Sequence, residues 1–331
     1  MQRAGRASQE IVRNAPLRLT RRLFCVGGAA LAASPLAAAP RKGGYVFAYF
    51  RNADDGRAGM RLAISRDGRK FTALRNGEPM IVPQVGENKL MRDPCVAQDP
   101  RSGLYHMVWT TGWTGITIGH ASSPDLANWS AQQAVPVMQD FAGTHNAWAP
   151  ELIYDPPTRR FVIVWASTVA GASPATTGMD PKLSRHRIYA TTTADFTTFS
   201  PTQLLFDPGF SVIDATFLRK GRKLYMFFKD ETETPARKHI QWCEAASPLG
   251  PFGPLSAPIT AAWAEGPTAF RVDDEIFVFY DRYMDKRYGA VATRDMVYWR
   301  DASPEIAVPD GASHGTIIPV DGARYAALQQ L

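Results

Sequence analysis

Ser123-Pro124-Asp125-Leu126-Ala127-Asn128-Trp129 follows a pattern that returns along the chain and indicates its fold. A small or hydroxyl residue is followed by an Asp, and an aromatic residue stands four positions after that Asp. The same pattern occurs at residues 65–71, 193–199 and 293–299, and a degenerate copy occupies residues 247–252. We expect each Asp to cap a turn between two strands, with the aromatic residue packed beneath it. Five copies of one turn indicate five repeated structural units.

A run of alternating apolar and aromatic residues lies upstream of each copy, and no segment shows a sustained helical period. These runs are residues 45–50, 104–110, 161–166, 224–228 and 276–280. Such runs are typical of the buried middle strands of small antiparallel sheets. Four-stranded sheets recurring in this way predict an all-β fold, a five-bladed β-propeller. A β-sandwich is the alternative, although sandwiches do not require the periodic turn.

The two ends of the repeated region are expected to meet in one blade. The first blade, beginning at Tyr45, lacks an innermost strand, whereas residues 314–320 form an additional strand near the C-terminus. Pairing of that strand with the N-terminal blade closes the ring and removes an exposed sheet edge.

Residues 1–39 are predicted to be a cleaved export signal that precedes a catalytic domain at residues 40–331. Arg21 and Arg22 stand before an apolar, alanine-rich run that ends at Ala39 and is too short to span a bilayer stably. The arginine pair resembles a twin-arginine signal, which predicts a periplasmic or secreted bacterial protein. An ordinary secretory signal or a retained N-terminal anchor are the alternatives.

Most of the basic excess of the chain belongs to this signal. It holds six arginines and one acid, so about +1 of the formal net charge of +6 remains after cleavage. A nucleic-acid partner is therefore not expected, nor is a membrane partner once the signal is removed. Cys25 leaves with the signal, and Cys95 and Cys243 remain either as buried thiols or as one disulfide.

Three acids stand where innermost strands are predicted to begin. They are Asp93 in Arg92-Asp93-Pro94, Asp214 in Ile213-Asp214-Ala215 and Glu265 in Ala264-Glu265-Gly266-Pro267. A propeller gathers the starts of its innermost strands at one end of the central channel. Carboxylates in such apolar contexts are costly unless they are paired, hydrogen-bonded or used in chemistry.

These motifs, with Trp148-Ala149-Pro150-Glu151 and His314-Gly315, resemble glycoside hydrolase family 43 from about Tyr45 to the C-terminal strand. The resemblance implies Asp93 as general base, Glu265 as general acid and Asp214 as the group that orients the acid and raises its pKa. Two carboxylates in these roles are what an inverting glycosidase needs. We predict that Asp93 and Glu265 lie about 6.5 to 9.5 Å apart, the separation of inverting enzymes.

Further residues are expected at the rim of the pocket, because the loops between second and third strands open at the same end. These loops include the charged stretch of residues 229–238 and residues 281–283. Trp113 and Trp148 could stack on a sugar ring, Glu151 could bond a sugar hydroxyl, and Arg282 could bond hydroxyls or a catalytic carboxylate. His314 resembles the axial histidine of the family, which in some members helps to hold a calcium ion or a water. A core histidine with satisfied hydrogen bonds is the alternative.

The resemblance implies a monomeric, exo-acting α-L-arabinofuranosidase that acts on plant-derived oligosaccharide or polysaccharide. It requires no cofactor, and a structural calcium ion is the one metal that it suggests. A β-xylosidase or a galactose-releasing exo-glycosidase of the same fold is a close alternative. From another class, the chain could be a glycan-binding propeller without turnover. A fructan-cleaving enzyme is disfavoured, because Asn52-Ala53-Asp54-Asp55 departs from the Asn-Asp-Pro-Asn motif of that group.

Overall fold

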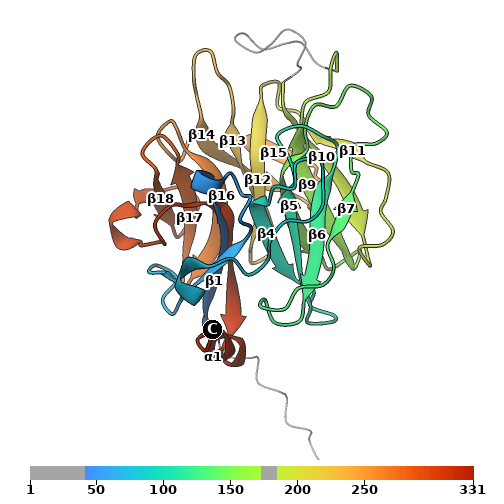
Figure 1. The fold of residues 1–331 in the computed structure, drawn as a ribbon. Coiled ribbons are helices and arrows are strands. Elements are labelled where there is room, and N and C mark those ends of the chain that lie inside the picture. Colours follow the sequence, from blue (N-terminus) through green and yellow to red (C-terminus); the bar gives the residue numbers. More distant parts are fainter. Residues whose placement is uncertain (1–41, 173–184) are drawn as a thin grey trace, which may run out of the picture. The chain divides into compact units, whose positions relative to one another are not determined.

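The computed structural model describes residues 42–172 and 185–331, and these residues form five antiparallel sheets of four strands each (Figure 1). The first blade holds β20 (Ala312–Asp321), β1 (Lys42–Arg51), β2 (Arg61–Ser65) and β3 (Thr72–Ala73). The second holds β4 (Arg92–Gln98), β5 (Tyr105–Thr110), β6 (Ile118–Ser123) and β7 (Gln133–Val135). The third holds β8 (Trp148–Asp155), β9 (Arg160–Ser167), β10 (Arg187–Thr193) and β11 (Gln203–Phe206).

The fourth blade holds β12 (Val212–Lys220), β13 (Lys223–Asp230), β14 (His239–Ala245) and β15 (Phe252–Leu255). The fifth holds β16 (Glu265–Val272), β17 (Glu275–Arg282), β18 (Arg287–Thr293) and β19 (Arg300–Asp301). Three 3-10 turns, η1 (Asn52–Asp54), η2 (Arg75–Gly77) and η3 (Ser303–Glu305), and the short helix α1 (Gly322–Leu328) complete the described elements. The predicted all-β five-bladed propeller is confirmed.

The repeated turn joins the third and fourth strands of a blade, as Asp125 illustrates. Its Oδ1 accepts hydrogen bonds from the backbone N–H of Ala127 at 2.9 Å and of Asn128 at 2.7 Å. Ser123 Oγ accepts from the N–H of Leu126 at 2.8 Å, and Leu126 adopts a φ of 70°. The side chains of the turn therefore accept hydrogen bonds from its own backbone N–H groups, which explains why the same residue types recur in each copy.

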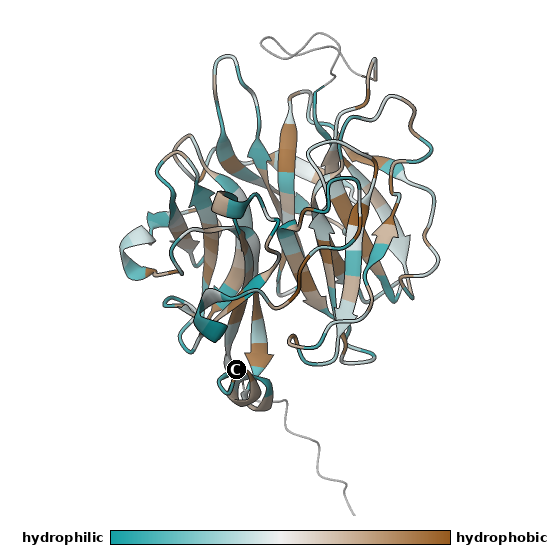
Figure 2. Ribbon diagram, in the orientation of Figure 1, coloured by the Kyte–Doolittle hydropathy of each residue, from teal (hydrophilic) through white to brown (hydrophobic). Residues whose placement is uncertain are grey.

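Apolar side chains fill the spaces between neighbouring blades. Each of the five buried clusters of the described residues draws its members from two adjacent blades, and Figure 2 shows hydrophobic residues along many of the strands. Cys95 and Cys243 belong to different clusters and are free, buried thiols. No helix among the described residues is long and apolar enough to cross a bilayer.

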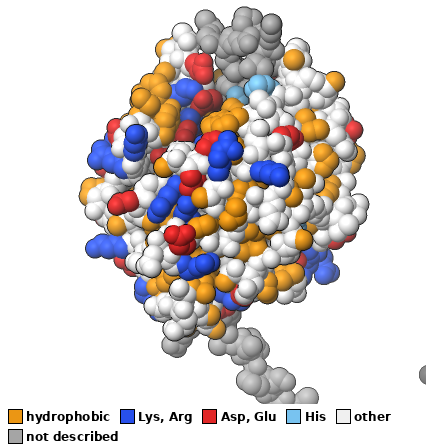
Figure 3. Space-filling model, viewed as in Figure 1, with side chains coloured by type: hydrophobic (Ala, Val, Ile, Leu, Met, Phe, Trp, Pro, Cys, Tyr) orange, Lys and Arg blue, Asp and Glu red, His pale blue; other side chains and the backbone are white. Residues whose placement is uncertain are grey.

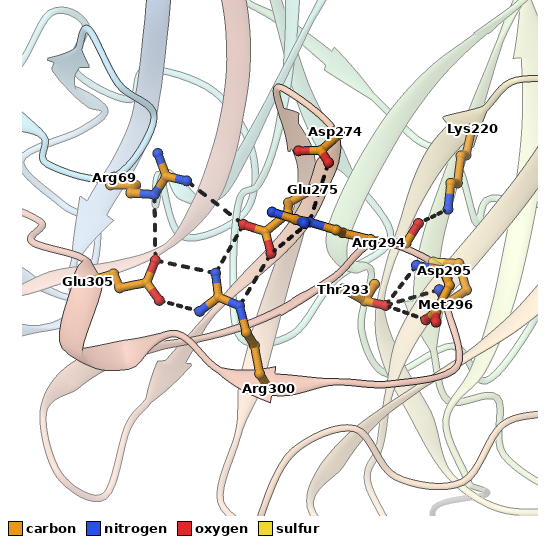
Figure 4. A network of polar contacts seen from close by, with 10 residues as sticks. All are labelled: Arg69, Lys220, Asp274, Glu275, Thr293, Arg294, Asp295, Met296, Arg300 and Glu305. Atoms are coloured by element: carbon orange, nitrogen blue, oxygen red, sulfur yellow. Dashed lines mark hydrogen bonds and ion pairs between the residues drawn. The ribbon is translucent and has the colours of Figure 1, made fainter.

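The ring closes as predicted, with β20 paired antiparallel to β1. On the outer side of the ring, side chains also join this first blade to the fifth blade. Arg69 lies 3.9 Å from Glu275 and 3.6 Å from Glu305, and Arg300 contacts both of these acids (Figure 4). Ala307 exchanges backbone hydrogen bonds with Arg69 and Phe71 at 3.0 and 2.8 Å. Ion pairs and backbone hydrogen bonds therefore hold the first blade against the fifth.

Basic and acidic side chains are interspersed on the face shown in Figure 3. This mixture agrees with the small net charge of residues 40–331 and offers no single-sign stripe on that face.

Candidate active site

Each innermost strand carries a β-bulge near its first residue, and these bulges build the site. The register with the neighbouring strand shifts between Arg92 and Cys95 in β4, between Ile213 and Thr216 in β12, and between Glu265 and Thr268 in β16. β8 shifts in the same way, and β20 shifts beside His314. A bulge re-aims the extra residue out of the ladder. Five bulges at one end of the ring thus direct side chains toward the channel axis.

Asp93 and Asp214 are bulge residues with positive φ values of 50° and 57°. Non-glycine residues in this region cost of order 1 kcal/mol or more and cluster at functional sites. Gly266 is the equivalent residue of β16, with a φ of 58°. Glu265 comes directly before that bulge and therefore reaches the axis from a position one residue earlier than the two aspartates.

Asp93 is held by two neighbours. Thr110, at the end of β5, donates to Asp93 Oδ2 at 2.7 Å, and His314 Nδ1 lies 3.3 Å from Oδ1. Burial alone would raise the pKa of Asp93, but the hydrogen bond and charge of His314, with help from Arg92 and Thr110, lower it. Asp93 is therefore ionised at neutral pH.

His314 carries the matching charge. Burial alone would lower the pKa of His314, but the carboxylates of Asp214, Asp93 and Glu265 raise it to about 9. The imidazole packs against Gly266, where an added Cβ would lie 2.5 Å from His314 Cγ. The close approach explains why glycine stands at this bulge.

A backbone hydrogen bond joins Asp214 to the strand start of Glu265, and a buried lysine pairs with Glu265. Asp214 Oδ2 accepts a hydrogen bond from the Gly266 N–H at 2.9 Å, which fixes the strand start that carries Glu265. Lys229, at the end of β13 and 2% exposed, lies 2.9 Å from Glu265 Oε2 and 2.7 Å from Glu231. Burial raises the pKa of Asp214 to about 6, against the opposing charges of His314 and Lys229. Burial alone would lower the pKa of Lys229, but Glu265 and Glu231 raise it.

A pocket of about 190 Å³ brings the three predicted carboxylates together. Asp93, Asp214 and Glu265 line it, and so do Trp113 and Trp148. Trp148 Nε1 donates to the backbone oxygen of Trp113 at 3.0 Å, and the two rings meet edge to face at 5.8 Å. The Arg92 guanidinium stacks 4.3 Å above Trp113 and is bonded by Asp55 at 2.9 Å. The wall beside Asp93 is therefore aromatic and fixed.

Glu151 and Arg282 do not line this pocket. The bulge of β8 uses Ala149 and Pro150, so Glu151 lies one step further along the channel. There it lines a separate cavity of about 560 Å³ and accepts a hydrogen bond from Thr216 at 2.5 Å. Arg282 lies 2.5 Å from Asp285 in its own hairpin. Their predicted contacts with sugar remain predictions without support from this arrangement.

Three polar side chains make contacts at the site that the sequence did not predict. Lys229 was expected in a charged rim of residues 229–238, yet it is buried against Glu265. Thr110 also accepts a hydrogen bond from the Ala149 N–H at 2.8 Å and so connects the second and third blades at Asp93. Asp281 is buried and pairs in register with Glu265, and burial and the charge of Glu265 raise its pKa to about 7. The sequence signal that could have identified these residues is a polar residue at the end of each apolar run.

His314 Nδ1 lies 3.3 Å from Asp93 Oδ1. Among residues 42–172 and 185–331 no group of three or more His, Cys, Asp and Glu side chains is arranged to hold a metal. The role of His314 at a calcium ion or a water stays a prediction.

Residues 41–326 match a family model, related to glycoside hydrolase family 43, that is described as "Probable glycosyl hydrolase domain". The chain belongs to these family-43-related glycoside hydrolases. The family match agrees with the resemblance found in the sequence motifs and with the five blades described above. Membership of this family supports glycosidase activity and does not identify the sugar that is released.

Comparison with individual proteins shows distant likeness. An α-L-arabinofuranosidase of Bifidobacterium longum subsp. longum is 24% identical over 217 residues, which cover 60% of this chain and 20% of that protein. The chain thus matches a fifth of the length of this curated relative.

Among solved structures, an α-L-arabinofuranosidase from Lactobacillus brevis is 18% identical with a TM-score of 0.52, over 64% of this chain and 72% of that chain. A family-43 β-1,3-galactosidase is 13% identical with a TM-score of 0.51, over 67% and 78%. At these identities the likeness concerns the fold alone.

Proposed function

We propose that this glycoside hydrolase is an exo-acting, inverting enzyme that releases α-L-arabinofuranosyl residues from plant-derived oligosaccharide or polysaccharide. One observation carries the hydrolytic role: Asp93, Asp214 and Glu265, from three different blades, line one pocket. The pocket, at about 190 Å³, is smaller than the roughly 300 to 1,000 Å³ of typical small-molecule sites. This size favours a single terminal sugar and hence exo action.

Asp93 is the proposed general base. It is ionised, and Thr110 and His314 fix both of its oxygens. A water placed against it can lose a proton to the carboxylate while the water oxygen attacks the anomeric carbon. The charged His314 stabilises Asp93 before the attack.

Glu265 is the proposed general acid. Lys229 bonds its Oε2, which leaves Oε1 to carry a proton toward the leaving oxygen. The negative charges of Asp214 and Glu231 offset the nearby ammonium group of Lys229. Asp214 positions the acid through its hydrogen bond with the Gly266 N–H, as the family resemblance implies.

The names of two similar proteins support release of arabinose, and the name of a third supports a second candidate sugar. The B. longum protein and the L. brevis structure are both called α-L-arabinofuranosidases. The β-1,3-galactosidase of the same fold keeps a galactose-releasing enzyme as the alternative, with β-xylosidase activity beside it. We also propose that the protein is a monomer exported by residues 1–39, which lie outside the described residues, to the periplasm or beyond. A structural calcium ion stays a prediction.

The test is a screen of nitrophenyl glycosides with the wild-type protein and Glu265→Gln. Hydrolysis of the α-L-arabinofuranoside is expected, with kcat/KM on an oligosaccharide reduced about 10²- to 10⁴-fold in the variant. Glu244→Gln, an exposed glutamate of the same protein, is the matched control and should keep full activity. A wild-type protein that binds glycan but cleaves no glycoside would identify a binding propeller instead.

A further inference from the structure

The pocket has two chemically different sides. Water is activated at Asp93, next to Trp113 of the second blade, whereas the leaving group departs past Glu265 at the start of the fifth blade. In an inverting reaction these events occur on opposite faces of the sugar ring. The part of the substrate beyond the cleaved bond must therefore lie on the Glu265 side.

Two aromatic residues from separate loops stand on that side. Trp263 lies two residues before Glu265 and is 43% exposed, and Tyr283 follows β17, which pairs with β16. Their rings meet edge to face at 6.2 Å. Both loops open at the end of the ring where β16 begins.

An unbroken set of contacts links this pair to the carboxylate. Lys229 Nζ lies 4.8 Å from the centre of the Tyr283 ring and 2.9 Å from Glu265 Oε2. The cation fixes the tyrosine beside the acid, and the tyrosine supports the indole of Trp263. The pair is therefore tied to the reacting group.

Trp263 is not placed there by core packing. It belongs to none of the buried clusters of the described residues and adopts a φ of 67°, which costs of order 1 kcal/mol for such a residue. The Ala264 N–H donates to the Lys238 oxygen at 2.9 Å and anchors the strained backbone. A strained, exposed indole beside a reactive group is typical of a binding surface.

We propose that Trp263 and Tyr283 form the binding platform for the first sugar ring of the leaving group. The apolar face of that ring packs on the indole, as amphipathic ligands pack on aromatic side chains. The platform would make the enzyme prefer substrates whose cleaved bond joins two sugars. This inference rests on the proposed role of Glu265 as the acid.

The experiment compares two substrates that share the released sugar and differ in the leaving group. One is an arabinofuranosyl-substituted xylo-oligosaccharide, and the other is methyl α-L-arabinofuranoside, which has no leaving ring; if the glycoside screen identifies another sugar, the pair is built on that sugar. For Trp263→Ala the ratio of kcat/KM for the oligosaccharide to that for the methyl glycoside is expected to fall about tenfold. Trp263→Phe should restore most of the ratio.

Tyr298→Ala, which removes an 81% exposed aromatic side chain of the same blade, is the control and should leave the ratio unchanged. An equal loss on both substrates in Trp263→Ala would overturn the platform, and so would an unchanged ratio. Failure of the proposed function looks different, because the wild-type protein would then cleave neither substrate or Glu265→Gln would keep its activity.

Discussion

Lys229 lies 2.9 Å from Glu265 although only 2% of the lysine side chain is exposed. A buried ammonium of this kind is stable because it is paired, here with both Glu265 and Glu231. The pairing fixes the orientation of Glu265 and leaves one carboxylate oxygen for the substrate.

Lys229→Met should leave Glu265 without its partner cation, whereas Glu231 keeps its ion pair with Lys238. Breaking a buried pair in this way costs about 3 to 5 kcal/mol, and we expect a lower melting temperature together with a loss of kcat. Thermal unfolding and steady-state kinetics measure the two effects. Lys223→Met removes an exposed ion pair of the same strand and should change neither; equal behaviour of the two variants would refute the assigned role of Lys229.

His314 predicts a pH dependence of stability. Its folded pKa of about 9 lies above the ordinary 6.5, so its charged form stabilises the fold. This contribution, at most about 3 kcal/mol, is fully present below pH 6.5 and is lost as the pH rises through 9. Urea unfolding from pH 5 to 10 measures the difference in unfolding free energy between wild type and His314→Gln. This difference should shrink as the pH rises from 6.5 through about 9. A difference that stays constant would contradict the His314–Asp93 pairing.

Gly266→Ala tests the close packing at the bulge of β16. The new Cβ would lie 2.5 Å from His314 Cγ in a backbone with a φ of 58°, so both steric overlap and strain are expected. We predict a loss of more than about 2 kcal/mol of stability together with reduced turnover. Gly209→Ala is the control for strain alone, because Gly209 has a φ of 91° and no neighbour within 4 Å. Chemical denaturation of both variants separates strain from overlap.

The predicted inverting mechanism has a direct readout in the product. Proton NMR recorded within the first minutes of hydrolysis should show the anomer opposite to that of the substrate, before mutarotation mixes the two forms. Asp93 and Glu265 should correspondingly lie about 6.5 to 9.5 Å apart in a crystal structure. Retention of configuration would require a nucleophile in place of the activated water.

The fold was predictable because its signal is local and repeated. Ser123, Asp125 and Trp129 carry a complete turn within seven residues, so four good copies and a weak one reveal the blades. The positions of Asp93, Asp214 and Glu265 at strand starts were predictable for a related reason, because each stands in a short local motif, whereas their roles stay predictions that rest on the family resemblance.

Other parts of the site depend on geometry that no local pattern contains. Glu151 was expected to bond a sugar hydroxyl at the pocket rim, but the bulge at Ala149 places it further along the channel, beside Thr216. Lys229 seemed to begin an exposed loop, but Glu231 and Glu265, one of them on another strand, make its burial favourable. Contacts between blades, such as Thr110 with Ala149, are set by the radius of the ring and have no sequence period.

The pairing of β20 with β1 has a consequence for biosynthesis. His314 is on the last strand of the ring to leave the ribosome, while its partner Asp93 is made more than two hundred residues earlier. A nascent chain can therefore assemble its middle blades during translation, yet it holds an incomplete reaction centre until the final strand emerges. Chains that stop before β20 are expected to be catalytically silent, which makes activity itself a marker that this strand has been made and paired.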